Sequence, residues 1–300
     1  MVEKIHTLAG KKIGMLGKGG AGKSTVTALL ARALAEQGYV VYILDADSTN
    51  IGLHQALGID HPPMPLLDYF GGAVFRGGQV TCPVDDPTPL PNAVIRWETL
   101  PENYHAQSSH GIRYLIAGKI GAQGPGAGCD GPVAKIARDV TIEGTPNKAV
   151  TLVDFKAGFE DSARGAITNL DWAVVVVDPT NAAIQMAVDM QHLVEQIQAG
   201  ELPATEHLES PELVELANAT FRNASIQGVL FVLNRVTSQQ MEDYLRGKLE
   251  EHGLKPLGVI HADPAIAMAW LTGSTLESDQ AQREIQDVIN ELERAVVHYE

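Results

Sequence analysis

The sequence is poor in cysteine, in basic side chains and in long apolar runs. Its two cysteines, Cys82 and Cys129, are too few for a disulfide framework, and a cytosolic chain would keep both reduced. Lysine and arginine number 22 against 37 aspartates and glutamates, so the net charge of −15 opposes a broad surface for nucleic acid or anionic lipid. The most apolar stretches, 173–177 and 229–233, have the length of strands rather than of membrane spans. We therefore expect a cytoplasmic protein whose partners are neither nucleic acid nor membranes.

What the chain does contain is a regular alternation of short apolar runs and segments of helical spacing, which is typical of an α/β protein. The pattern predicts strands at 12–16, 39–44, 112–117, 149–154, 172–177, 226–233 and 257–260. It predicts helices at 23–37, from residue 132, and at 182–197, 238–252 and 281–297. We expect a mostly parallel, doubly wound sheet with helices on both faces and ligands at the carboxyl ends of the strands. Prolines and paired glycines punctuate residues 60–111, so we expect one domain over 1–300 with an ordered insertion there.

Residues 17–25, with the sequence GKGGAGKST, join the first predicted strand to the first predicted helix. Such a loop forms a phosphate cradle, because glycines let backbone N–H groups converge on an anion and the helix N-terminus adds a partial positive charge. Lys23 adds a point charge, and Ser24 offers its hydroxyl to Mg²⁺. We therefore expect ATP and Mg²⁺ to bind here, with contacts from Gly19, Gly20, Ala21, Gly22, Lys23, Ser24 and Thr25.

The same loop also satisfies a dinucleotide pattern. Gly17, Gly19 and Gly22 match G-x-G-x-x-G, and Asp45 follows at about the distance of a ribose-binding acid. A pyrophosphate on a glycine turn needs no Lys-Ser pair, whereas a γ-phosphate with its metal uses both. The triphosphate is therefore our interpretation. A dinucleotide-dependent oxidoreductase remains an alternative, which NADH binding without ATP binding would establish.

Three aspartates follow or close predicted strands and are expected to face the phosphate loop. Asp45 and Asp47 come after the second strand, where one carboxylate can orient water and another can hold the hydration shell of the metal. Asp154 closes a later strand and fits the metal side of the site, and Gly158 can bring its backbone N–H near the γ-phosphate. We assign Ser24, Asp45 and Asp154 to the Mg²⁺ ion and its shell. The alternative is that these aspartates only cap the helices that follow them.

The run KGGAGKST at 18–25 resembles the deviant phosphate loop of the MinD/ParA class, which includes the nitrogenase iron protein and the nickel-insertion ATPase CooC. The resemblance implies a P-loop NTPase fold and a Mg²⁺-dependent ATPase that closes as a homodimer. It implies that Lys18 reaches the partner subunit's nucleotide, that Lys23 is catalytic in its own subunit and that Asp47 orients the attacking water. It also places at Asn234 an amide that hydrogen-bonds adenine. The alternatives are a solvated loop lysine at 18 and a turn asparagine at 234.

Further segments resemble the CooC-type pattern, namely GKI at 118–120, GAGCDGP at 126–132, VDFKAGFE at 153–160 with RG at 164–165, VVVDP at 175–179 and DPAI at 263–266. This resemblance implies an accessory ATPase for metalloenzyme maturation, with a nickel-dependent, carbon monoxide dehydrogenase-like client. In CooC-type proteins a Cys-x-Cys-Pro turn from each subunit binds a metal at the dimer interface. Cys129 is therefore a candidate ligand for nickel or zinc.

The chain departs from that pattern at Gly131, which stands in place of the second cysteine, and at Lys156, where an acidic residue is expected. Two subunits would then offer two thiolates, too few for a tetrahedral site without help from Asp130, a histidine, Cys82 or a client. An iron–sulfur cluster of the nitrogenase iron-protein kind would need a cysteine beyond the Asp154 strand, and the sequence has none there. The alternative function is a MinD/ParA-like positioning or partition ATPase that acts on a protein, membrane or nucleoid partner.

Overall fold

The structure is a computed structural model that describes residues 6–72, 80–119, 130–143, 147–159 and 162–299. The strands of its main sheet are β1 (Lys12–Gly17), β2 (Val40–Ala46), β4 (Ala106–Gln107), β5 (Arg113–Ile116), β7 (Ala149–Phe155), β8 (Trp172–Val177), β9 (Gly228–Val236) and β10 (Pro256–His261). They form an eight-stranded sheet in the order β10-β9-β8-β1-β7-β2-β5-β4, and only the two-residue edge strand β4 pairs antiparallel. The predicted, mostly parallel α/β fold is confirmed.

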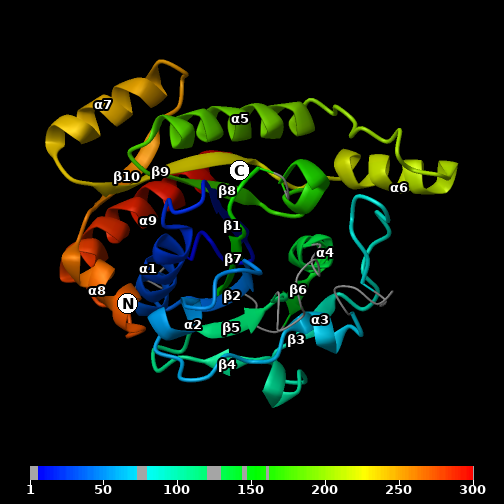
Figure 1. The fold of residues 1–300 in the computed structure, drawn as a ribbon, viewed down its shortest axis with the longest axis horizontal. Helices are drawn as coiled ribbons and strands as arrows, with labels where there is room; N and C mark the ends of the chain where they lie inside the picture. Colours follow the sequence, from blue (N-terminus) through cyan, green and yellow to red (C-terminus); the bar gives the residue numbers. More distant parts are fainter. Residues whose placement is uncertain (1–5, 73–79, 120–129, 144–146, 160–161, 300) are drawn as a thin grey trace.

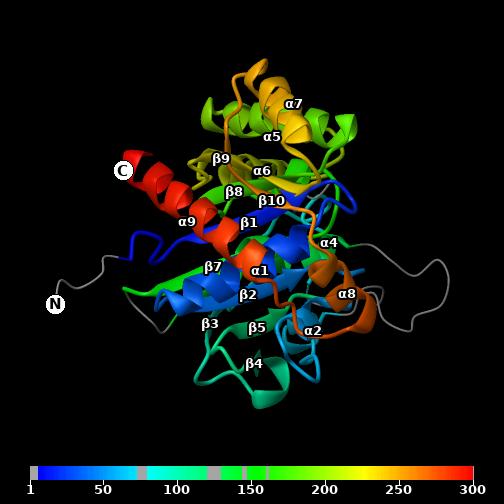
Figure 2. The ribbon, with the colours of Figure 1, turned by 90° about the vertical axis from the view of Figure 1, so that its left-hand side faces the viewer.

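Helices cover both faces of this sheet (Figure 1). On one face lie α1 (Lys23–Glu36) and α9 (Asp279–Tyr299), which pack on each other along the sheet (Figure 2). On the other face lie α4 (Gly131–Asp139), α5 (Asn181–Gln198) and α7 (Gln239–Glu250). Burial on both faces explains why β8, and β1 after Lys12, are apolar rather than alternating.

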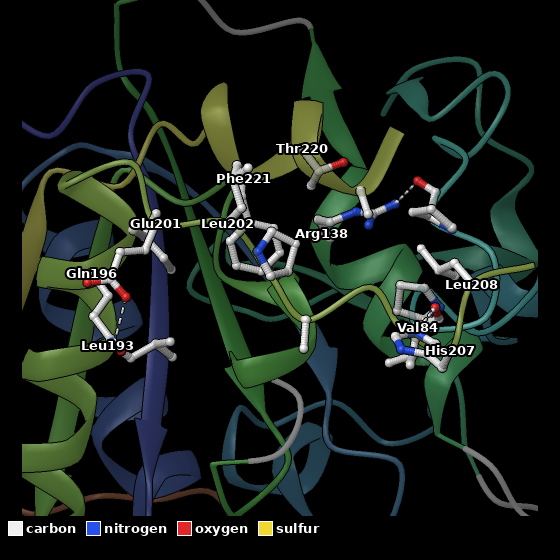
Figure 3. Close-up of a pocket in the computed structure, with 16 residues that line it drawn as sticks. Val84, Arg138, Leu193, Gln196, Glu201, Leu202, His207, Leu208, Thr220 and Phe221 are labelled. Atoms are coloured by element: carbon white, nitrogen blue, oxygen red, sulfur yellow. Dashed lines mark hydrogen bonds between the residues drawn. The ribbon is translucent and has the colours of Figure 1, made fainter. Parts of the chain in front are cut away.

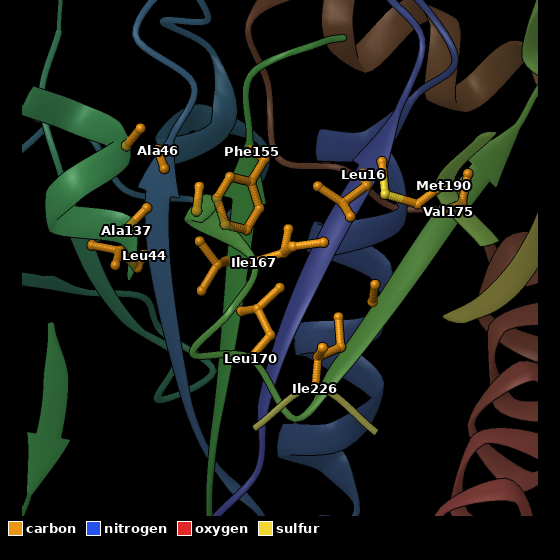
Figure 4. Packing of buried hydrophobic residues seen from close by; sticks show 14 of the residues in the cluster. Leu16, Leu44, Ala46, Ala137, Phe155, Ile167, Leu170, Val175, Met190 and Ile226 are labelled. Carbon is orange, nitrogen blue, oxygen red and sulfur yellow. The ribbon is translucent and has the colours of Figure 1, made fainter. Parts of the chain in front are cut away.

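The side chains of β8 show how one strand serves two cores. Ala173, Val175 and Val177 point to the core under α4, α5 and α7, and the residues between them point to the core under α1 and α9. In the first core, Phe155, Ile167 and Leu170 lie next to one another (Figure 4). Gly14 of β1 is required there, because a Cβ at this position would lie 2.5 Å from a Leu170 methyl and 2.9 Å from the Phe155 ring.

Residues 60–111 contribute α3 (Leu66–Tyr69), β3 (Val94–Arg96), the 3₁₀ turn η1 (Glu102–Tyr104) and β4. β3 pairs in parallel with β6 (Thr141–Glu143) in a small second sheet, and β4 extends the main sheet beside β5. This segment therefore packs against the sheet and α4 rather than standing apart from them.

The sequence pattern missed several elements and some boundaries. Outside the insertion, the additional elements are β6, α2 (Leu53–Ala56), the short helical segment η2 (Ser162–Ala166), α6 (Pro211–Arg222) and α8 (Pro264–Thr272). α8 escaped because it is apolar on nearly every side and so lacks the helical period, although Ala269 is its one buried residue. β9 runs on to Val236, so Asn234 lies inside this strand and not after its end. Among the described residues, no helix combines the length and apolarity that a membrane crossing requires.

Candidate active site

The loop between β1 and α1 has the backbone of a phosphate cradle. Gly20 and Gly22 adopt φ angles of 81° and 94°, a region that favours glycine. Lys23 is buried, and its Nζ lies 3.5 Å from the Lys18 carbonyl oxygen, so it lies along the loop and not out in solvent. Burial lowers the pKa of Lys23, while Asp154 and Asp47 oppose that shift. Gly22 gives α1 no side-chain cap, which leaves the positive N-terminus of the helix to an anion.

Asp154 lies directly under this loop. It is fully buried, and its two oxygens accept hydrogen bonds from Ser24 Oγ at 2.6 Å and Thr27 Oγ1 at 3.3 Å. Asp154 on β7 is in register with Asp45 on β2, so two buried carboxylates are neighbours across the sheet. Burial, and then the charge of Asp45, raise the pKa of Asp154 to about 7. A buried carboxyl with a raised pKa beside a serine hydroxyl suits a cation, which would restore its ionised form.

Asp45 and Asp47 lie on a tight turn at the end of β2. Asp45 Oδ2 accepts hydrogen bonds from Tyr114 Oη at 2.5 Å and Lys119 Nζ at 2.8 Å, and Oδ1 accepts one from the Asp47 N–H at 3.1 Å. Asp45 is therefore enclosed, and both of its carboxylate oxygens accept hydrogen bonds from protein donors. Among the described residues, every hydrogen bond to the Asp47 carboxylate is accepted by Oδ1. The donors are the backbone N–H groups of Thr49 and Asn50 and the Thr49 hydroxyl. Oδ2 is thereby left to a ligand or a water molecule.

The other predicted residues also gather around the loop, with different partners from those expected. Lys18 is one-third exposed and forms an ion pair with Asp178 of its own subunit, at 3.6 Å. The Gly158 N–H donates to the Gly17 carbonyl at 3.3 Å, so in this state it faces the loop backbone. Asn234 donates from Nδ2 to the Ala21 carbonyl at 2.7 Å, which fixes β9 against the loop. A Cβ at Gly22 would collide with this amide.

Sequence reasoning missed four side chains that complete the site. Asn50 donates from Nδ2 to Ser24 Oγ at 2.7 Å, and Thr27 completes the Asp154 contacts. Trp270 of α8 donates from Nε1 to Thr25 Oγ1 at 2.9 Å. Lys119 lies in the CooC-like segment at 118–120, to which the sequence assigned no role of its own. The structure places its ammonium group on the Asp45 turn. Thr27 and Asn50 had a local signal, because each follows a predicted site residue by three positions, whereas nothing local indicates the other two.

Cys129, the candidate transition-metal ligand, lies outside the described residues. Its neighbour Asp130 is described, and it accepts a hydrogen bond from Ser48 Oγ at 2.8 Å and forms an ion pair with Lys156. At Gly131, where the resemblance expects a second cysteine, Cys82 packs directly on the backbone, since a Cβ there would lie 2.5 Å from the Cys82 sulfur. In the part of the chain that the structure describes, no three metal-ligating side chains gather into a site.

The profile of CobQ/CobB/MinD/ParA nucleotide-binding domains matches residues 15–276 of the chain. The chain belongs to this family. Over 190 residues it is 30% identical to the carbon monoxide dehydrogenase accessory protein CooC of Rhodospirillum rubrum, which covers 61% of this chain and 68% of that protein. It is also 31% identical to an uncharacterised ATP-binding protein of Methanocaldococcus jannaschii over 188 residues. That alignment covers 62% of this chain and 74% of the relative.

Among solved structures, the MinD protein of Pyrococcus horikoshii in complex with Mg-ADP superimposes with a TM-score of 0.59, over 97% of this chain and 98% of that one. At 19% identity this likeness shows the fold. The predicted membership of the MinD/ParA class, with a CooC-like relative, is thus confirmed, and with it the expectation of an ATPase. Within this ATPase family, ATP and Mg²⁺ are the cofactors that suit the cradle and the Ser24–Asp154 pair.

One cavity lies away from this site (Figure 3). It has a volume of about 430 Å³ and lies between the C-terminal part of α5, α6 and the segment around Val84. Its lining is mainly apolar, with Leu193, Leu202 and Phe221 on one side. The Arg138 guanidinium at its edge is already paired with Asp139, at 2.6 Å, so its charge is compensated within the protein. The residues that line the cavity lie outside the phosphate loop and outside 45–50, so the cavity is not part of the phosphate site.

Proposed function

We propose that this family member is an ATP-driven dimeric switch that acts in metalloenzyme maturation, with the cytoplasm as its place of action. In this proposal ATP and Mg²⁺ bind at 19–25, two subunits close, and hydrolysis reopens them. Lys18 would leave Asp178, cross the interface and neutralise charge on the transferred phosphoryl group, while Asp47 orients water and Asn234 turns to adenine. When bound, the metal ion would neutralise phosphate charge beside Ser24 and Asp154.

The observation that carries the maturation role is the bonding of Asp130. This residue follows Cys129 in the chain, and it is bonded both to Ser48, which follows Asp47, and to Lys156, two residues after Asp154. Asp130 is therefore attached to the two segments that would respond to the γ-phosphate. A change in nucleotide state would reach a metal or client next to Asp130 through a single side chain, which is the coupling an insertion ATPase requires. The likeness to CooC supports the same role.

Cys82 alters the expected metal chemistry. Its side chain occupies the space beside Gly131 that the side chain of a second cysteine would take. If nickel or zinc binds at Cys129, Cys82 is the other thiolate that each subunit can supply. A dimer would then offer four sulfurs. In this proposal the client is a carbon monoxide dehydrogenase-like enzyme, and the transition metal is nickel or zinc.

The second candidate is a MinD/ParA-like positioning or partition ATPase. The favouring observation is the fold, which aligns with MinD along nearly the whole chain. Against it stand the net charge of −15 and the terminal helix α9, where acidic side chains outnumber basic ones. On this alternative the switch would be retained and its partner would be another protein, a membrane or nucleoid DNA.

The deciding experiment measures metal content and oligomeric state together. Reduced protein, with and without ATP and Mg²⁺, is passed through size-exclusion chromatography with inline elemental analysis, alongside Cys129→Ser and Cys82→Ser variants. Nickel or zinc that follows the ATP-dependent dimer and is lost in both variants would support maturation with four thiolates. An ATP-dependent dimer without metal would shift the proposal to the positioning role, which salt-sensitive DNA binding or liposome binding would then test.

A further inference from the structure

The ammonium group of Lys119 lies at the centre of three oxygen atoms on one turn. It donates to Asp45 Oδ2 at 2.8 Å, to the Asp47 carbonyl at 2.6 Å and to the Asn50 carbonyl at 2.5 Å. An ammonium has three donors and no acceptor, so these three bonds saturate it. Lys119 therefore occupies the turn as a bound cation would, although the side chain comes from the end of the neighbouring strand β5.

These bonds fix the backbone on which the reacting groups are mounted. Because the carbonyls of Asp47 and Asn50 are drawn to one point, the intervening N–H groups turn inward and hold Asp47 Oδ1, at 3.0 Å from Thr49 and 3.2 Å from Asn50. The same turn directs the Asn50 amide to Ser24 Oγ at 2.7 Å. The positions of two groups that matter for ATP, the Asp47 carboxylate and the Ser24 hydroxyl, thus depend on Lys119. The Lys119 side chain itself contacts neither group.

The charge of Lys119 also stabilises the buried Asp45 carboxylate on this turn. Asp45 has no exposed surface, lies beside Asp154 in the sheet register and is followed by Asp47. Burial raises the pKa of Asp45, and the Lys119 charge is the largest opposing cause. Without Lys119 the buried Asp45 carboxylate would lie beside Asp154 without its ion-pair partner, which favours outward movement of the turn.

The opposite side of the turn is held as well. Ser48 Oγ donates to Asp130 Oδ1 at 2.8 Å, and Asp130 is in turn paired with Lys156. The Lys119 and Asp130 contacts reach the turn from different strands and helices, so the position of Asp47 is over-determined by tertiary contacts rather than by its own sequence.

We propose that Lys119 is a positioning residue for ATP hydrolysis, which closes the turn 45–50 and thereby holds the Asp47 carboxylate and the Asn50 amide in place at the phosphate loop. It acts through those residues and does not itself contact the nucleotide. Asp130 assists from the opposite side through Ser48. The proposal rests on the role proposed above for Asp47 in ATP hydrolysis and is independent of the transition metal and the client.

The test compares kcat and KM for ATP in the wild-type chain, Lys119→Met and Lys119→Arg, with ATP in excess over protein and saturating Mg²⁺. Lys119→Met keeps the length of the side chain and removes the charge and its three bonds. A misplacement of the reacting group by about 1 Å costs about a hundredfold in rate, so kcat is expected to fall by about that factor while KM stays within about threefold. Lys119→Arg, which retains the charge, is expected to recover part of kcat.

The matched control is Lys135→Met. Lys135 is also a buried, ion-paired lysine, bonded to Thr81 Oγ1 at 2.7 Å and to Asp86, but it lies on α4 outside the turn. Its loss is expected to lower the melting temperature and leave kcat unchanged. A wild-type kcat in Lys119→Met, an equal kcat loss in Lys135→Met, or a rise in KM with kcat retained would each overturn the proposal. If Lys119→Met does not fold, Lys119→Gln and Asp130→Ala decide, because each removes contacts that hold the turn, and wild-type kcat in both overturns it.

Discussion

At the scale of the residue, Asp154 is the group whose environment is most informative. It is buried under the phosphate loop, and its oxygens are bonded to Ser24 and Thr27. Because the pKa is raised to about 7, part of the population holds a proton there at neutral pH in the absence of a cation. Binding of Mg²⁺ would favour the ionised form and release this proton, so metal binding should strengthen as the pH rises through 7.

A first prediction follows for stability without nucleotide. The folded-state pKa of Asp154 lies above its ordinary value, so its contribution to stability is fully present below about pH 4 and is lost as the pH rises through about 7. Asp154→Asn is expected to flatten the fall in melting temperature over that window and to abolish Mg²⁺-dependent hydrolysis. Thermal melts across the pH range, with hydrolysis assays, check both. An unchanged pH dependence of the melting temperature would contradict the assignment.

Asp86 is the control, because its pKa is shifted in the opposite direction to that of Asp154. Hydrogen bonds from Thr88 and Thr81, with the charge of Lys135, lower its pKa to about 2, against the effect of burial. Its contribution is present above its ordinary pKa and is lost as the pH falls towards 2. Asp86→Asn should therefore lower the melting temperature at neutral pH and leave Mg²⁺-dependent hydrolysis intact.

At the scale of the element, α4 is anchored by a side chain from another layer. Lys12, at the start of β1, donates from Nζ to the carbonyls of Ala137, Arg138 and Val140 at 2.8–2.9 Å. Those are carbonyls of the last turn of α4, where the helix leaves acceptors without partners and its dipole is negative. Burial lowers the pKa of Lys12 to about 8, so the ammonium persists at neutral pH. α4 also begins beside Asp130, which makes its position important for the cysteine turn.

We predict that Lys12→Met destabilises the protein by about 1–3 kcal/mol, because buried carbonyls at the C-terminus of α4 lose their donor. Chemical denaturation measures this directly. Lys148→Met is the control, since this lysine is exposed between strands. Equal stability in the two variants would show that Lys12 does not support the helix.

The helix α8 is coupled to the phosphate loop in a similar way. Its Trp270 donates to Thr25 Oγ1, and the ring packs over Gly52, where a Cβ would lie 3.0 Å from it. Gly52 follows the Asp45 turn, so the indole contacts both segments that a nucleotide would move. Met268 and Leu271 on the same helix are exposed.

We therefore predict that Mg-ATP changes the intrinsic fluorescence of Trp270. The hydrogen bond to Thr25 and the contact with Gly52 set the polarity around the indole, and both lie beside the phosphate site. Titration with Mg-ATP should give a saturable change in wild-type protein and in Trp97→Phe, and none in Trp270→Phe. A change of the same size in Trp270→Phe would mean that α8 does not respond to the nucleotide.

At the scale of the whole molecule, the ion pair between Lys18 and Asp178 bears on assembly. The pair is partly exposed, with an Nζ to Oδ2 distance of 3.6 Å. Exposed pairs of this kind stabilise a protein by at most about 1 kcal/mol, so a bound nucleotide on a second subunit could displace it. Asp178 is also the acceptor of the Thr180 hydroxyl at 2.7 Å, which keeps it in place at the end of β8.

We predict that Asp178→Asn strengthens ATP-dependent dimerisation by up to about thirtyfold, since the Lys18 side chains of the two subunits would no longer need to leave two ion pairs of about 1 kcal/mol each. Asparagine retains the hydrogen bond from Thr180. Sedimentation or light scattering with Mg-ATP measures the dimer, and Lys18→Ala should abolish the gain. A dimer of unchanged strength in Asp178→Asn would argue against release of Lys18 from this partner.

The sequence by itself determined the elements that depend on local signals. The strands β1, β2, β7 and β8 are continuous apolar runs, and the helix α1 has helical spacing, so their type follows from short-range pattern alone. The phosphate loop is equally local, because the glycines at 20 and 22 set the backbone and Lys23 and Ser24 follow at fixed positions. Parallel strands place their carboxyl ends at one edge, which is why Asp45 and Asp154 could be placed together from the sequence.

Only the tertiary structure decided which side chains complete the site. Lys119 meets Asp45 across 74 residues and Trp270 meets Thr25 across 245, and no periodicity or motif records such pairs. α8 was missed for a related reason: an apolar helix without a polar face carries no period, and its place is fixed by contact with the loop. Local pattern governs backbone conformation over a few residues. The long-range order of the sheet governs which distant side chains meet, and so decides how the Asp47 carboxylate is held.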